Sequence, residues 1–153
     1  MISLHTFENT DDNCKLLYKW RTDITCNQNS FTQINNYTEF KSKFPSYFIN
    51  AIPIIFYQDN LPVVYCGIYH TDKYLDDYTI SIITNPILQK QGYGKICLKM
   101  AINYFSKIIN NNIIAEIKIH NKASIKIFEY VGFVKLDEYK YNNNIIIRYI
   151  YRI

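Results

Sequence analysis

Glycine and proline are scarce in this chain of 153 residues, with four of each, which argues against a fibrous or low-complexity protein. No apolar run reaches the roughly 18 residues that would cross a bilayer, and the 48% apolar content argues against disorder. Met1 to His5 lack a basic segment followed by an apolar core, so nothing predicts secretion. We expect one globular domain over residues 1–153, in the cytoplasm and without a membrane partner.

Cysteine is also sparse. The four cysteines, Cys14, Cys26, Cys66 and Cys97, have no close paired spacing, and no histidines are placed to complete a zinc site. We therefore predict reduced thiols and no metal. Cys66 falls in a predicted strand and Cys97 on the apolar face of a predicted helix, where small apolar side chains are expected.

A strong charge of one sign is missing as well. The formal net charge is +4, and the lysines are spread along the chain rather than gathered in one run. This balance favours a small polyanionic ligand, because it raises the local ligand concentration. Nucleic acid, bound by dispersed lysines and exposed tyrosines, is the weaker alternative, since no aromatic and basic signature motif is present.

Hydrophobic periodicity predicts a mixed α/β (α+β) domain built on one sheet. We expect strands at residues 2–7, 53–58, 62–69, 78–84, 113–119, 133–141 and 145–152, and helices at about 11–23, 37–44, 93–108 and 122–131. The helix at 93–108 lies in the crossover between two strands, which should therefore be parallel. Residues 25–36 are polar and irregular, and could form the rim of a substrate site.

A glycine-bearing loop, Gln89-Lys90-Gln91-Gly92-Tyr93-Gly94-Lys95, leads directly into the most strongly periodic helix. The first N–H groups of a helix have no internal partner and carry partial positive charge, so they can bind a phosphate. The loop therefore predicts a phosphorylated ligand.

Two common phosphate-binding loops do not match this spacing. A dinucleotide fingerprint needs a third glycine three residues after Gly94, where the chain has Cys97. A nucleoside triphosphate loop needs glycine at the position of Gln89 and serine or threonine at that of Ile96. A glycine turn without any ligand stays open on this motif alone.

Two motifs together resemble the GNAT superfamily of acyl-CoA-dependent N-acetyltransferases. They are Gln89-x-x-Gly92-x-Gly94, with Pro86 upstream, and Asn121-x-x-Ser124-x-x-x-Phe128-x-x-x-Gly132-Phe133. One helix and one strand separate them, as in the family, and the element order agrees over the whole chain. The resemblance implies the GNAT fold, with a mostly antiparallel, splayed sheet of six or seven strands and about four helices.

The resemblance implies acetyl-CoA as co-substrate. Loop N–H groups would hold the pyrophosphate, and the strand before the loop would pair with the pantetheine arm and offer an N–H to the acetyl carbonyl. The residues implied to bind acetyl-CoA are Ile82, Ile83, Thr84, Gln89, Lys90, Gln91, Gly92, Tyr93, Gly94, Lys95 and Asn121. An asparagine at position 121 is also explained by capping of the following helix.

Transfer to an amine needs a base, because a lysine-type amine with a pKa of about 10.4 is protonated at pH 7. Period-2 alternation places Glu116, Lys118 and His120 on one face of a strand. Glu116 matches a position that several relatives use as base, and is our catalytic candidate. A structural ion pair with a lysine is the alternative for Glu116, and His120 is a second base candidate.

Phe128 stands where many relatives carry the tyrosine that protonates the leaving thiolate. Tyr130 is close in sequence but about 200° around the helix, so it should point elsewhere. The chain has 15 tyrosines, and another one could supply the proton. A retained fold with weakened catalysis, acting as an acyl-CoA sensor or interaction module, is therefore an alternative function.

The expected function is transfer of an acetyl group to a primary amine of a protein or peptide N-terminus, a polyamine or an amino sugar. The segment from Leu16 to Asp23, together with Asn121-x-x-Ser124, is similar to branches that acetylate ribosomal-protein N-termini, polyamines or nucleotide-linked amino sugars. Those branches often carry asparagine in place of Thr22. Arg21 could bind a substrate phosphate or carboxylate, or could be a solvated residue at a helix end. The edge of the closing hairpin could be covered by a second copy, so a homodimer is possible.

Overall fold

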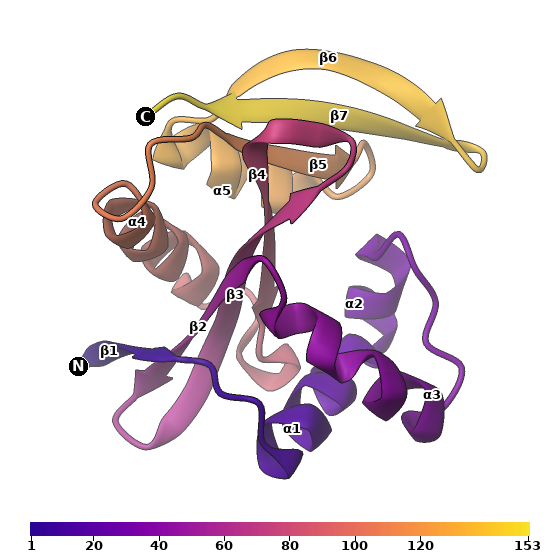
Figure 1. The fold of residues 1–153 in the computed structure, drawn as a ribbon, viewed down its shortest axis with the longest axis vertical. Helices are drawn as coiled ribbons and strands as arrows, with labels where there is room; N and C mark the ends of the chain where they lie inside the picture. The colour runs from indigo at the N-terminus through magenta and orange to yellow at the C-terminus, as the bar shows by residue number, and fades with distance from the viewer.

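The computed structural model describes residues 1–153, which form one seven-stranded sheet with helices on both faces (Figure 1). The strands are β1 Ile2–Thr6, β2 Ala51–Gln58, β3 Leu61–Thr71, β4 Tyr74–Thr84, β5 Ile113–Lys118, β6 Val134–Tyr141 and β7 Asn144–Tyr151. The helices are α1 Asp11–Arg21, α2 Ile24–Asn29, α3 Tyr37–Lys43, α4 Tyr93–Phe105 and α5 Lys122–Val131, with short 3₁₀ turns η1 Phe44–Phe48 and η2 Pro86–Leu88.

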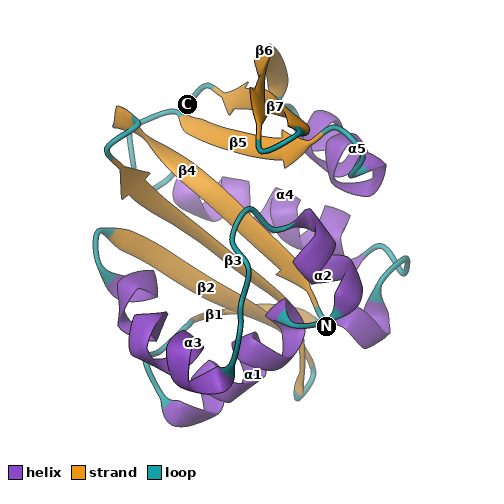
Figure 2. Cartoon of the chain, turned by 90° about the vertical axis from the view of Figure 1, so that its right-hand side faces the viewer, coloured by secondary structure: helices purple, strands orange, loops and turns teal.

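The strand order is β1-β2-β3-β4-β5-β7-β6, and every neighbouring pair is antiparallel except β4 and β5. This confirms the mixed fold and the predicted parallel pair. β4 and β5 are paired only at Tyr78 with Ile113 and at Thr79 with Ile114. Beyond these residues the two strands diverge, which splays the sheet into two parts (Figure 2).

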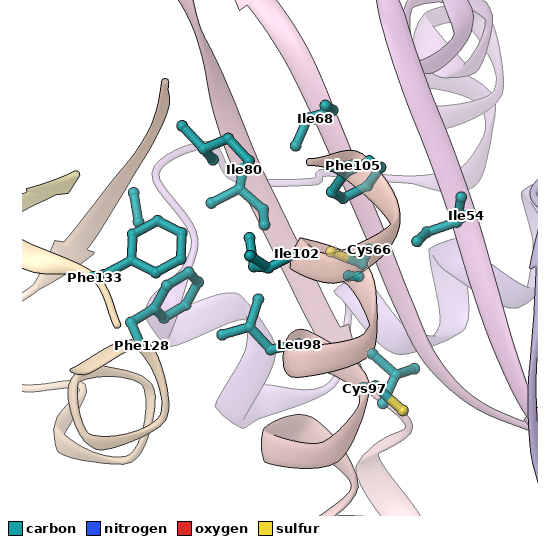
Figure 3. Packing of buried hydrophobic residues seen from close by; sticks show 14 of the residues in the cluster. Ile54, Cys66, Ile68, Ile80, Cys97, Leu98, Ile102, Phe105, Phe128 and Phe133 are labelled. Carbon is teal, nitrogen blue, oxygen red and sulfur yellow. The ribbon is translucent and has the colours of Figure 1, made fainter. Parts of the chain in front are cut away.

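Helices α4 and α5 lie on one face of the sheet, and α1, α2 and α3 lie on the other (Figures 1 and 2). The core beneath α4 contains Leu98, Phe105 and Cys97 from the helix and Cys66 from β3, all fully buried (Figure 3). Burial of each large apolar side chain contributes roughly 1.5–3 kcal/mol, so this i, i+3, i+4, i+7 face fixes the helix on the sheet. The predicted positions of both cysteines are confirmed.

A second core lies under the N-terminal helices. Trp20 is 2% exposed and packs in one cluster with Phe7, Leu17 and Ile83. Ile83 comes from β4, whose alternate residues face the opposite core. This cluster fixes α1 against the sheet, and thereby sets where its last residue, Arg21, lies.

Three boundaries differ from the sequence prediction. Residues 25–36 were expected to be irregular, yet α2 occupies part of them, because the Asp23 side chain accepts a hydrogen bond from Thr25 N–H and caps the helix. β3 and β4 extend as a hairpin to Thr71 and Tyr74, beyond the predicted ends. α4 ends at residue 105, three residues early, where the chain passes into turns.

The four cysteines are free thiols, and the structure contains no group of three histidine, cysteine, aspartate or glutamate side chains that could hold a metal ion. None of the helices has both the length and the apolar character needed to cross a membrane.

Candidate functional site

A cavity of about 680 Å³ lies where β4 and β5 separate. One wall is β4 from Thr79 to Thr84, and the opposite wall is β5 from Ala115 to Ile117. The start of α4, the start of α5 and the segment containing α2 close the remaining sides. The divergence of two parallel strands therefore creates this cavity.

The last residues of β4 offer unpaired backbone groups to this cavity. Tyr78 N–H donates to Asn112 O at 3.0 Å, so the backbone of Tyr78 faces β5. Because backbone groups alternate along a strand, those of Ile82 and Thr84 face the same side, beyond the last pair with β5. The Ile83 backbone faces β3, and its side chain packs in the second core.

Asn85 sets the direction of the chain after β4. Its side chain is buried, donates to Pro62 O at 3.0 Å and accepts from Ile87 N–H at 3.3 Å. These bonds fix η2 and bring the following loop to the mouth of the cavity. Six of the seven predicted loop residues line it, namely Gln89, Lys90, Gly92, Tyr93, Gly94 and Lys95, whereas Gln91 is exposed outside it.

Backbone conformation explains one loop glycine, and close packing explains the other. Gly92 is the N-cap of α4 with φ of 87°, a left-handed conformation that other residues adopt at a cost. A Cβ on Gly94 would lie 3.2 Å from Thr84 Oγ1 and 3.3 Å from Ile127 Cδ1, so helix and strand approach closely there. The first turn of α4 contains no acidic residue. Its free N–H groups can therefore hold an anion, as the sequence predicts.

The start of α5 completes this end of the cavity. Asn121 lines the cavity, and its Oδ1 accepts a hydrogen bond from Ser124 N–H at 3.3 Å. Phe128 also lines the cavity and packs edge-on against Phe133, with 4.9 Å between ring centres (Figure 3). Tyr130 is 57% exposed beside Lys95 and is absent from the cavity wall, as expected from its angle on the helix.

Glu116 lies on β5 in the cavity wall, and one of its carboxylate oxygens accepts two hydrogen bonds. Its Oε2 accepts hydrogen bonds from Lys73 Nζ at 2.9 Å and from the Tyr139 hydroxyl. Burial opposes the charge on Lys73, but the bonds to Tyr139 and Glu116 raise the pKa of Lys73 above its usual value. Burial and the bond to Glu116 raise the pKa of Tyr139. The ion pair given as the structural alternative for Glu116 is present, with Glu116 in the cavity wall and Lys73 outside it.

Tyr69 and Thr79 face each other across the β3–β4 hairpin, next to the point where β4 and β5 meet. Both line the cavity. Thr79 Oγ1 is buried and has no hydrogen-bond partner, so this hydroxyl is free to donate and to accept a hydrogen bond. Burial and the charge of Glu116 raise the pKa of Tyr69, so its hydroxyl stays protonated at neutral pH.

The N-terminal helices supply the last wall, and the segment 25–36, expected as the rim of a substrate site, contributes Thr25, Cys26 and Asn29 among others. Arg21 lines the cavity, donating from Nη1 to the Tyr47 hydroxyl at 2.7 Å and from Nη2 to Thr32 Oγ1 at 3.3 Å. The side chain is therefore partly buried and anchored, rather than solvated at a helix end. The second base candidate, His120, is outside the wall, with Nε2 3.0 Å from Asn29 Oδ1 of α2.

Sequence analysis missed Tyr69, Thr79 and Lys73. Their signal was the hairpin itself, because strands extended to Thr71 and Tyr74 place Tyr69 opposite Thr79 and Lys73 at the tip. Tyr69 and Thr79 fall inside the predicted strands 62–69 and 78–84, but the predicted ends left out Lys73 and the turn that sets the register between the two strands. The contact from the tip to β5 depends on the parallel pairing and has no local signature.

Residues 4–134 match the family described as the acetyltransferase (GNAT) domain. The solved aminoglycoside acetyltransferase AAC(6')-Ib in complex with coenzyme A is similar, with a TM-score of 0.82, 14% identity, and 99% of this chain and 95% of that chain covered. Spermidine N-acetyltransferase from Vibrio cholerae in complex with CoA and spermine is also similar, with a TM-score of 0.83 and 13% identity. The match covers 98% of this chain and 94% of that chain.

A domain from Methanocaldococcus jannaschii gives a TM-score of 0.78 at 22% identity, with 99% of each chain covered. No curated protein matches the chain in sequence.

Proposed function

Because this chain belongs to the GNAT acetyltransferase family, we propose that it transfers the acetyl group of acetyl-CoA to a primary amine by direct attack in a ternary complex. One observation carries this proposal. A single cavity runs from the free N–H groups of α4, past the unpaired backbone of β4, to a charged carboxylate on β5. The proposed phosphate site, the strand proposed to align the thioester and the proposed general base therefore line the same cavity.

Acetyl-CoA fits the residues present. The loop from Gly92 to Lys95 offers backbone donors and two lysine charges nearby, which suits a pyrophosphate. The unpaired groups of Ile82 and Thr84 suit the amides of the pantetheine arm, which would add to β4 as a short strand. Asn121 caps α5 and lines the same end of the cavity. Its proposed contribution is to fix the start of α5 beside the cofactor, since its side chain carries no charge.

Glu116 is the proposed general base. The protonated amine gives one proton to its carboxylate through a water, and the nitrogen attacks the thioester carbon to form a C–N bond. The C–S bond then breaks with its electron pair on sulfur, and the second proton that leaves the nitrogen balances the one taken up by the departing thiolate. Lys73 pairs with the Glu116 carboxylate at 2.9 Å and so fixes its position in the cavity wall. An ion pair and a base are therefore compatible roles for one residue.

Tyr69 is the proposed proton donor to the departing thiolate. It is one of two tyrosines in the cavity wall, and the other, Tyr93, lies at the helix end proposed for the pyrophosphate. Tyr69 lies instead opposite Thr79, near the meeting point of β4 and β5. Its raised pKa keeps the hydroxyl protonated at neutral pH. This position would compensate for the missing hydroxyl at Phe128.

Release of CoA thiol in the presence of a panel of amines tests the proposal, with thermal stabilisation by acetyl-CoA as a parallel measurement. We expect acetyl-CoA to raise the melting temperature and at least one amine to raise thiol release above background hydrolysis. Tight acetyl-CoA binding without any amine-dependent release would instead favour the sensor, which the phenylalanine at position 128 also favours.

A further inference from the structure

The charged residues that line the cavity are unusual for a site that binds an amine. Glu116 is the one carboxylate among its lining residues, and that charge is already paired with Lys73. Lys90 and Lys95 lie at the loop end, where the proposed function places the acetyl-CoA phosphates. Arg21 is the remaining charged residue in the wall, at the α2 side. Among the residues that line the acceptor side, Arg21 is therefore the one charge without an ion-pair partner.

Arg21 has no anionic partner within the protein. Its two hydrogen bonds go to the neutral hydroxyls of Tyr47 and Thr32, and no carboxylate lies within ion-pair distance. Its Nε is buried and without any hydrogen-bond partner. A guanidinium has five N–H donors in a planar fork that matches a carboxylate or phosphate. Each Nη of this partly buried and anchored guanidinium thus keeps one N–H free, and with no carboxylate partner the group can bind an anion.

Arg21 and Glu116 act on the same part of the cavity. Burial raises the pKa of Tyr69 most, the charge of Glu116 raises it further, and the charge of Arg21 lowers it. The Tyr69 hydroxyl is therefore within electrostatic reach of both groups. An acceptor with its amine near Glu116 would place its other end toward Arg21.

Resting on the proposed function, we propose that the acceptor is an amine that also carries a carboxylate or phosphate, and that this anionic group binds Arg21. A polycation, such as the spermine bound by one structural neighbour, would meet an uncompensated positive charge and no free carboxylate. The site therefore selects against polyamines and aminoglycosides, although the fold is shared with enzymes for both.

The test compares matched acceptors that differ only in the anion. The pairs are butylamine with 4-aminobutyrate and glucosamine with glucosamine 6-phosphate, and spermidine and kanamycin serve as polycations. We expect kcat/KM to be about 10- to 100-fold higher for the anionic member of at least one pair, since charged hydrogen bonds are of that strength. The pair that responds distinguishes carboxylate from phosphate.

Arg21→Met should remove this preference by lowering kcat/KM for the anionic member alone, with acetyl-CoA affinity unchanged. Lys19→Met is the matched control, because it removes one positive charge from an exposed position on the same helix. If Arg21→Met does not fold, Tyr47→Phe keeps the arginine but removes one anchor, and should weaken the preference several-fold.

Equal loss for neutral and anionic acceptors in Arg21→Met, or a preference of the native enzyme for spermidine or kanamycin, would overturn this proposal. If no amine is acetylated, the proposed function fails on its own terms. The inference is then judged from the melting temperature with CoA and each amine. Stabilisation by anionic members that depends on Arg21 supports it, and the absence of any such stabilisation overturns it.

Discussion

Lys73 and Glu116, 43 residues apart in the sequence, form an ion pair with 2.9 Å between Nζ and Oε2. The lysine is at the tip of the β3–β4 hairpin, and the glutamate is in the cavity wall on β5. The glutamate side chain is only 15% exposed, and Tyr139 donates to the same oxygen. A carboxylate held by two donors at a defined position is well placed to receive a proton through a water.

Glu116→Gln should lower kcat by about 10²- to 10³-fold, because the amide cannot accept the proton, whereas general base catalysis contributes about that much. The affinity for acetyl-CoA should change little. Steady-state kinetics of CoA release will measure the effect. Glu138→Gln is the control, since Glu138 also pairs with a lysine but lies on the exposed surface of β6. Equal activity of the two variants would exclude Glu116 as the base.

Lys73→Met separates a base from a purely structural ion pair. Without the nearby cation a carboxylate holds its proton more tightly, so the acidic limb of the pH–rate profile should move to higher pH. Lys135→Met, which breaks the exposed pair with Glu138, should leave the profile in place. A lower melting temperature of Lys73→Met with an unmoved profile would assign the pair to stability alone.

Gly92→Asp and Gly92→Asn form a matched test of the anion seat. Both replace glycine at φ of 87°, where nothing lies within 4 Å of the new Cβ, so each should cost about 1 kcal/mol of stability. Only aspartate adds a negative charge at the N-terminus of α4. We expect at least tenfold weaker acetyl-CoA binding for aspartate than for asparagine, by calorimetry. Equal affinities would remove this loop from the phosphate site.

Tyr69→Phe should reduce kcat by about 10²-fold while sparing acetyl-CoA affinity, because it removes the proposed proton donor but keeps the ring. Tyr130→Phe is the control, as that tyrosine is exposed and outside the cavity. Phe128→Tyr in the Tyr69→Phe background should recover part of the rate. Unchanged kcat in Tyr69→Phe would mean that the thiolate leaves without help from this residue, and would withdraw its assignment.

The parts of the fold that sequence analysis predicted are those with local signals. The start of α4 at residue 93 follows from the glycine loop and an unbroken apolar stripe, and the parallel pair of β4 and β5 follows from chain order. α2 was missed because its six residues form no apolar stripe and none of its side chains is fully buried. It is held instead through its cap and through contacts to the end of β5, where Lys118 Nζ donates to Gln28 O at 3.1 Å.

The candidate site likewise has one part that the sequence predicts and one part that it does not. The cofactor side is a contiguous segment with a motif, so its residues could be named in advance. The acceptor side is assembled from α1, β3, β4 and β5, and its contacts join Arg21 to Tyr47 and Lys73 to Glu116. A single sequence gives the residue types of such pairs but not their distances.

Cys26 gives a prediction about pH at the acceptor side. It lines the cavity, and burial, followed by the charge of Asp23, raises the pKa of its thiol to about 11, while Arg21 opposes the shift. A raised thiol pKa lowers the thiolate fraction at any pH below it. Alkylation by iodoacetamide at pH 8 should therefore be on the order of 100-fold slower than for a free cysteine, whose pKa is about 8.5.

The alkylation rate should rise about tenfold for each pH unit until the pH approaches 11, because only the thiolate reacts and its fraction grows tenfold per unit below the pKa. Mass spectrometry of the intact protein will follow the reaction, and Cys26→Ser should abolish it, since the other three cysteines are buried. Rapid, pH-independent labelling of Cys26 near pH 7.5 would contradict the burial of this thiol. An acceptor bound in the cavity should slow the labelling further, because Cys26 forms part of the wall that the acceptor would cover.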